Sequence, residues 1–303
     1  MDDVIVVAGL RKDYGDVHAV DDLTFTVRRG EVFALLGPNG AGKTTTVEIL
    51  EGHRTRTSGA VTVEGFDPAT GGRAYREQIG IVLQEAGFDE EFTVRELVRL
   101  YASLYPRRRD PDELIDLVGL ADKRDAKTKT LSGGQRRRLD LALGLVGDPR
   151  LLFLDEPTTG FDPSARRRAW DLIASLRSLG TTILLTTHYM EEAQALADRV
   201  AVIVAGRLVA LGTPADLVSR ERTATIVFTL PPGVGPAALP PVTGAVRVDG
   251  DAVTIETTRA TDDLQALTTW ARQLGIDLPD LTLSRATLED VYLKLTGADG
   301  DDA

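Results

Sequence analysis

Short apolar runs separated by turn residues dominate the first part of the chain. Val4–Val7, Leu23–Val27 and Val32–Leu36 are apolar or alternate in polarity. Gly15-Asp16 and Arg29-Gly30 lie between them. Runs of this length bounded by turn residues predict β-strands.

The pattern changes over residues 93–145, where apolar side chains recur at helical spacing. This holds from Val94 to Leu104 and again from Leu114 to Val118. The spacing predicts a helical insertion in an α/β domain. Continuous apolar runs return at Leu151–Leu154 and Thr181–Thr187, and these predict buried strands.

The pattern of apolar and polar residues changes once more near residue 221. Strand-like runs at Thr225–Leu230 and Val253–Thr257 surround the proline-rich stretch Pro231–Pro241, and Asp262–Leu274 reads as a helix. We therefore expect an α/β nucleotide-binding domain at 1–220 and a small α+β domain at 221–297. Residues 298–303 contain only Gly, Asp and Ala, which predicts a disordered tail.

Composition narrows the class of protein. The net charge of −11 argues against a non-specific nucleic-acid binder, which needs cationic surface. The sequence has no cysteine, so disulfides and Cys-ligated metals are excluded. No stretch approaches 18 uninterrupted apolar residues, so we expect any membrane-spanning part of the system to be a separate chain.

One glycine-rich stretch carries the strongest chemical signal. It follows the apolar run Val32–Leu36 and precedes a predicted helix at Thr46–Leu50, and it consists of Gly37, Pro38, Asn39, Gly40, Ala41, Gly42, Lys43, Thr44 and Thr45. A strand, a glycine turn and a helix N-terminus in this order form a phosphate-binding loop. Lys43 is expected to reach the β- and γ-phosphates of a nucleotide, and the Thr44 hydroxyl to bind Mg²⁺.

A second phosphate-type helix start follows the helical insertion. Ser132 suits an N-cap, Gly133 and Gly134 leave room for a close approach, and Gln135 follows them. The next residues, Arg136–Arg138, are interpreted as a solvated helix start.

Polar residues end three of the predicted buried strands. Asp155 and Glu156 follow Leu151–Leu154, His188 follows Thr187, and Gln84 follows an apolar run. Strand ends of this kind line ligand sites in open α/β sheets. Asp155 is expected to hold Mg²⁺, and Glu156 to polarise the water that attacks the γ-phosphate. His188 is expected to contact the γ-phosphate, and Gln84 to lie beside the metal and the water.

With these pieces in order, residues 4–220 resemble the ATP-binding subunit of an ABC transporter. The motifs that carry this resemblance are the phosphate loop, Gln84, the signature Leu131–Gln135, the Asp155-Glu156 pair, a turn aspartate at Asp162 and His188. The resemblance implies a P-loop NTPase core with an antiparallel β subdomain and a helical subdomain. It also places Tyr14 at the aromatic position that stacks on adenine, and Asp162 near the nucleotide; by itself Tyr14 could equally be a surface tyrosine.

The tail Ser284–Gly297 is similar to the end of ABC-2-type exporter ATPases of the daunorubicin-resistance group. The resemblance implies ATP and Mg²⁺, a head-to-tail homodimer with two ATP sites, and a separate transmembrane permease. It also implies a peripheral position on the cytoplasmic face of the membrane, with no nucleic acid as partner. Two rival hypotheses stay open: a soluble ABC ATPase without a transport role, and an importer ATPase whose C-terminal domain is regulatory.

Overall fold

The chain forms two compact units, Met1–Pro214 and Ala215–Ala303. The computed structural model describes residues 2–82, 87, 89, 91–220 and 223–296. Gln84 lies outside these residues. The sequence predicts a domain boundary at residue 220, six residues after the observed division. The helix α8 (Pro214–Arg220), which the sequence analysis does not anticipate, lies between the two positions.

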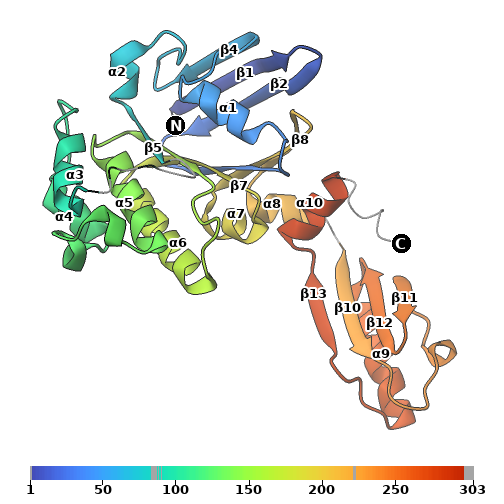
Figure 1. Ribbon diagram of the computed structural model, residues 1–303. Coiled ribbons are helices and arrows are strands. Elements are labelled where there is room, and N and C mark those ends of the chain that lie inside the picture. Colours follow the sequence, from blue (N-terminus) through green and yellow to red (C-terminus); the bar gives the residue numbers. More distant parts are fainter. Residues whose placement is uncertain (1, 83–86, 88, 90, 221–222, 297–303) are drawn as a thin grey trace. The chain divides into compact units, whose positions relative to one another are not determined.

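A six-stranded sheet forms the centre of the first unit (Figure 1). Its strand order is β5-β6-β7-β3-β8-β9, and every pair is parallel except β8 with β9. The bounds are β3 Val32–Leu36, β5 Ile79–Val82, β6 Leu151–Asp155, β7 Thr182–Thr187, β8 Arg199–Val204 and β9 Arg207–Gly212. The inner strands are buried on both faces, which explains their continuous apolar sequences.

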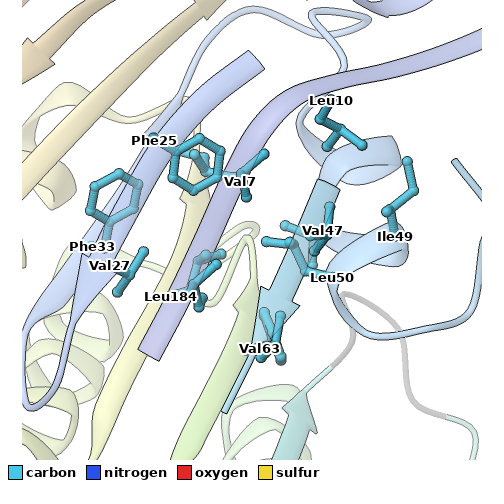
Figure 2. Close-up of a cluster of buried hydrophobic side chains, with 14 of the residues drawn as sticks. Val7, Leu10, Phe25, Val27, Phe33, Val47, Ile49, Leu50, Val63 and Leu184 are labelled. Atoms are coloured by element: carbon cyan, nitrogen blue, oxygen red, sulfur yellow. The ribbon is translucent and has the colours of Figure 1, made fainter. Parts of the chain in front are cut away.

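A three-stranded antiparallel sheet accompanies the central one, in the order β2-β1-β4. Its strands are β1 Asp3–Tyr14, β2 Val17–Arg28 and β4 Ser58–Val63. Phe25 and Val63 from this sheet, Leu50 from α1 (Lys43–Leu50), and Phe33 and Leu184 from the central sheet share one buried cluster (Figure 2). This cluster fixes the helix that follows the phosphate loop against both sheets.

The remaining helices of the first unit cover the central sheet and form the helical insertion. They are α2 Gly72–Arg76, α3 Val94–Ala102, α4 Pro111–Leu117, α5 Gly133–Leu145, α6 Pro163–Ser178 and α7 Met190–Leu196. The insertion consists of α3, α4 and the first part of α5, which pack together (Figure 1). Thr93 begins α3 with a reciprocal capping box to Glu96.

The second unit has its own sheet and its own core. Its antiparallel strands have the order β11-β12-β10-β13, with bounds β10 Ala224–Thr229, β11 Ala245–Asp249, β12 Ala252–Thr257 and β13 Thr282–Arg285. The long helix α9 (Ala260–Leu274) packs Leu267 and Ala271 against Ile226 and Phe228 of the sheet. A last helix, α10, spans Leu288–Thr296.

The fold class predicted from the sequence is confirmed: a P-loop core, an antiparallel β subdomain, a helical subdomain and a small α+β unit. Two short helices, α2 and α8, are additions to the predicted elements. Among the described residues, no helix combines the length and the apolar character that crossing a bilayer requires.

Candidate functional site

The carboxyl ends of three neighbouring parallel strands bring the phosphate loop, Asp155, Glu156 and His188 to one sheet edge. The strands β6, β7 and β3 are adjacent, and Asp155 pairs in register with Thr186. The phosphate loop follows β3, Glu156 follows β6, and His188 follows β7. This is the edge where open α/β sheets bind ligands.

The glycines of the phosphate loop are required by close backbone approaches. A Cβ atom on Gly37 would lie 2.3 Å from the carbonyl oxygen of Ile203. Gly42, with φ +96°, would place one 2.3 Å from the carbonyl oxygen of Ala19. Gly40 has φ +79° and open space around it. The loop therefore favours glycine at these positions, for space at Gly37 and Gly42 and for the positive φ at Gly40 and Gly42.

Lys43 lies folded against this loop. Its Nζ donates hydrogen bonds to the carbonyl oxygens of Gly37, at 2.8 Å, and Pro38, at 3.1 Å, and only 5% of the residue is exposed. Burial lowers the pKa of the ammonium group, while the charges of Glu156 and Asp155 act in the opposite direction. A phosphate would offer this ammonium charged oxygens in place of the neutral carbonyls.

The predicted metal ligands offer oxygen atoms, which Mg²⁺ prefers. Thr44 is exposed in the first turn of α1. Asp155 ends β6, and its Oδ1 accepts a hydrogen bond from the hydroxyl of Thr186, which is fully buried. Together with phosphate oxygens, Thr44 and Asp155 fit the small set of protein ligands that Mg²⁺ takes in nucleotide sites.

Glu156 is the most tightly held side chain of the site. Its Oε1 lies 3.2 Å from Nδ1 of His188, and its Oε2 accepts a hydrogen bond of 3.1 Å from the hydroxyl of Thr159. Its backbone N–H donates to the hydroxyl of Thr186, at 3.0 Å. The side chain is 14% exposed, so the carboxylate is restrained and still reachable by water.

The ring of His188 also packs on Tyr189, with 4.0 Å between ring centroids, and the guanidinium of Arg166 lies 4.5 Å from the Tyr189 ring. In the next turn, Glu192 is fully buried and accepts hydrogen bonds from Thr158, at 2.8 Å, and Trp170, at 3.2 Å. Burial raises the pKa of Glu192. These contacts connect the segment after β7 to the segment after β6.

The signature residues form the start of α5. Ser132 is the N-cap: its hydroxyl accepts from the N–H of Gln135, and the Gln135 side chain accepts from the N–H of Ser132, at 2.9 Å. A Cβ added to Gly133 or Gly134 would meet no atom of the described residues within 4 Å. The fold of the single chain therefore does not explain why these positions are glycine.

Two other predicted residues occupy plain structural positions. Asp162 is the N-cap of α6, where its Oδ1 accepts from the N–H of Ala165, at 2.8 Å. Tyr14 ends β1 and is 41% exposed; its hydroxyl accepts from Arg54, and the Nζ of Lys12 lies 4.9 Å from its ring centroid. The guanidinium carbon of Arg54 lies 5.5 Å from the same centroid, so two cations lie over the ring.

The sequence analysis is wrong about one arginine. The sequence predicts a solvated helix start at Arg136–Arg138, but Arg137 turns inward and donates to the backbone carbonyl oxygens of Asp155, Glu156 and Pro157. No sequence signal singles it out, because each of the three arginines lies one turn before a buried residue, Asp140, Leu141 or Ala142. Thr159 and Thr186, which hold the two carboxylates, carry no such signal either.

Comparisons with known proteins agree with this geometry. Residues 20–159 match the ABC transporter family model, and residues 224–287 match the model "ABC transporter domain-containing protein-like, C-terminal domain". The daunorubicin resistance ATP-binding protein DrrA3 of Streptomyces coeruleorubidus is 43% identical over 98% of this chain and 97% of its own length. The Nod factor export ATP-binding protein I of Ralstonia nicotianae is 40% identical over 97% of this chain and 94% of its own.

Solved structures give the same result for the first unit. The cbiO1 structure from Clostridium perfringens, part of the ABC transporter complex cbiONQ, superposes with a TM-score of 0.66 at 30% identity. The superposition covers 73% of this chain and 92% of the cbiO1 chain. An ATP-binding subunit of an ABC transporter superposes with a TM-score of 0.65 at 29% identity, over 72% and 92% of the two chains.

Proposed function

This chain belongs to the family of ABC transporter ATP-binding proteins, and on that premise we propose that it hydrolyses ATP to energise an ABC-2-type exporter. The names of two relatives, which match along nearly their whole lengths, support export as the direction of transport. The cargo class we propose is a drug, an antibiotic or another hydrophobic molecule. The membrane pathway would belong to a separate permease, with this subunit on the cytoplasmic face of the membrane.

The arrangement around Glu156 is the observation that carries the catalytic part of the proposal. Lys43 and the loop N–H groups would hold the β- and γ-phosphates, and Tyr14 would stack on the adenine. Thr44 and Asp155 would hold Mg²⁺, which supplies positive charge beside the phosphate oxygens. Glu156 would accept a proton from the attacking water, and His188 would orient Glu156 and contact the γ-phosphate.

A head-to-tail homodimer would complete each ATP site. Ser132 and Gly133 are exposed and Gly134 is partly exposed, and among the described residues no contact requires the glycines. We propose that these residues and Gln135 cap the γ-phosphate held by the Lys43 of the other subunit. ATP would then join the two subunits, and its hydrolysis would release them.

The test is to tag the protein in its native cells, solubilise the membranes gently and identify what co-purifies. An integral membrane protein whose addition raises the ATPase rate of the purified subunit would support the exporter. Recovery with a ribosome or a DNA complex would overturn the transport role and favour a soluble ABC ATPase. If the purified subunit hydrolyses no ATP, either alone or with the co-purified membrane protein, the catalytic assignment is overturned.

A further inference from the structure

The helix that begins with the signature also reaches the catalytic segment of its own subunit. Arg137, in the second turn of α5, donates from Nη2 to the carbonyl oxygen of Asp155, at 2.9 Å, and to that of Glu156, at 3.4 Å. Its Nε donates to the carbonyl oxygen of Pro157, at 3.2 Å. One guanidinium thus binds three consecutive carbonyl groups at the end of β6.

The surroundings of Arg137 are mainly apolar, so these hydrogen bonds are needed to stabilise its charge there. Its side chain lines a small hollow between α5, β6 and α6 whose other walls are mainly apolar, among them Leu141, Leu154, Phe161 and Leu172. A charged group in such a place needs hydrogen-bond partners, and the planar guanidinium presents donors on separate nitrogens, whereas a lysine donates from one. Burial raises the pKa of Asp140, one turn further along α5, to about 7, and its carboxylate, when ionised, opposes the effect of burial on the pKa of Arg137.

The segment that Arg137 binds is also backbone-strained. Glu156 has φ +45°, in the left-handed region that residues with a side chain rarely adopt. Such a conformation persists only where the surrounding contacts impose it. The N–H of Glu156 is fixed by Thr186 on one side, and its carbonyl is fixed by Arg137 on the other.

We propose that Arg137 is a positioning residue that holds Asp155–Pro157 so that the Glu156 carboxylate faces the attacking water. It acts through the backbone and does not touch the nucleotide. Because α5 begins at the signature, this contact also joins the element that would cap the other subunit's ATP to the carboxylate that would cleave its own. The inference rests on the ATPase function proposed above.

The first test compares ATP binding with turnover in the purified protein. Arg137→Met keeps the apolar part of the side chain and removes the donors, and we expect kcat to fall at least about tenfold with the Kd for ATP changed less than about threefold. Arg137→Lys, which keeps the charge but donates from one nitrogen instead of several in a plane, should restore part of the lost kcat. Thermal unfolding in both variants identifies molecules that fail to fold.

Arg138 provides the matched control. It lies on the same helix and also donates to two carbonyl oxygens, those of Val118 and Gly119, but these are in the helical insertion. Arg138→Met should therefore lower kcat much less than Arg137→Met does. Equal losses of kcat in the Arg137 and Arg138 variants would overturn the proposal, as would an unchanged kcat in folded Arg137→Met.

A mixed dimer separates the effect of Arg137→Met on the catalytic site of the same subunit from its effect on the signature offered to the other subunit. One subunit carries Glu156→Gln, so only the subunit with intact Glu156 can turn over. Placing Arg137→Met in the intact subunit should lower its rate at least about tenfold. Placing it in the Glu156→Gln subunit, which supplies the signature, should leave the rate within about twofold of the unsubstituted mixed dimer. The reverse pattern would overturn the proposal.

Failure of the two proposals can be told apart. If the unsubstituted protein hydrolyses no ATP, the proposed function is overturned, and with it the catalytic consequence of Arg137. If it hydrolyses ATP but binding and turnover fall together in Arg137→Met, the function stands and the positioning role does not. The homomeric comparison of kcat with Kd decides this even in a preparation that forms no mixed dimers.

Discussion

The carboxylate of Glu156 is held from three directions, by His188, Thr159 and its own strained backbone. A left-handed conformation costs a non-glycine residue on the order of 1–3 kcal/mol. The hydrogen bonds of the Glu156 backbone with Thr186 and Arg137 hold the residue in this conformation. At the scale of single residues, the site thus fixes the orientation of the Glu156 carboxylate. Removing the charge of Glu156 or of Lys43 should therefore affect ATP hydrolysis and ATP binding differently.

Glu156→Gln should leave ATP binding intact and abolish turnover, because the amide keeps the shape of the side chain but cannot accept the proton of water. We expect a loss of about 10³-fold in kcat, on the scale of a removed general base. The measurement is ATP hydrolysis beside equilibrium binding, with the exposed Glu113→Gln as control. Full hydrolysis by Glu156→Gln would contradict the assignment of the base.

Lys43→Ala should lose nucleotide affinity, because the ammonium that would face the β- and γ-phosphates is removed. A fall of at least about tenfold in affinity corresponds to one charge-assisted hydrogen bond. Titration with a fluorescent ATP analogue measures it. Lys123→Ala, whose side chain is 40% exposed in the helical insertion, is the control. Unchanged affinity in Lys43→Ala would rule out the predicted phosphate contact.

Glu51 predicts a pH dependence of stability. It is 4% exposed at the end of α1, and burial, with the nearby charges of Asp155 and Glu48, raises its pKa from 4.5 to about 8. In the unfolded chain the carboxyl ionises near its ordinary pKa, whereas the folded protein retains the proton to about pH 8. The free energy of unfolding therefore falls as pH rises between these two values.

Glu51→Gln should remove this dependence. Its gain in stability should be small near pH 4.5 and reach a few kcal/mol above pH 8, since one pKa unit corresponds to about 1.4 kcal/mol. Urea unfolding at pH 5, 7 and 8.5 measures the gain, again with Glu113→Gln as control. A gain that is equal at all three pH values would exclude protonation as its cause.

At the scale of elements, α5 illustrates how far sequence reasoning reaches. Its start at the Ser132 cap could be predicted, because a cap and two glycines precede a helix-forming run. The inward direction of Arg137 could not, since three successive arginines look alike until the phase of the helix is known. Similarly, β3, β6 and β7 could be predicted from continuous apolar runs, whereas α2 is too short to show any helical periodicity.

The first turn of α5 also yields a prediction in which stability and activity move apart. In Gly134→Ala the new methyl group meets nothing in its own chain, and alanine favours the helix by up to about 1 kcal/mol. The folded chain should be as stable as before or more so. The ATPase rate should nevertheless fall at least about tenfold, because the methyl group would obstruct the nucleotide of the other subunit.

The same substitution elsewhere in α5 supplies the contrast. A Cβ on Gly144 would lie 2.7 Å from the Cγ2 atom of Val82, so Gly144→Ala should lower the melting temperature. Thermal unfolding and ATPase assays on both variants test the pair. A destabilised Gly134→Ala, or a fully active one, would mean that this face of α5 does not meet a nucleotide.

At the scale of the whole molecule, two separate cores predict two separable unfolding transitions. Phe228 is fully buried in the core of the second unit. Phe228→Ala should cost that unit about 3–5 kcal/mol and lower only one transition. ATP with Mg²⁺ should raise the other, since a ligand stabilises the unit that binds it. Calorimetry measures both, and a single transition that responds to both changes would show that the units unfold together.

The self-contained core of the second unit has an evolutionary consequence. Among the residues that the structure describes, the buried members of this cluster run from Ile226 to Leu278, all within the second unit. A genetic crossover in the stretch before Ile226 would therefore join two intact hydrophobic cores from different parents. Recombination among related genes could exchange this module as a whole, while every residue of the phosphate loop and of the Glu156 segment stayed with its original neighbours.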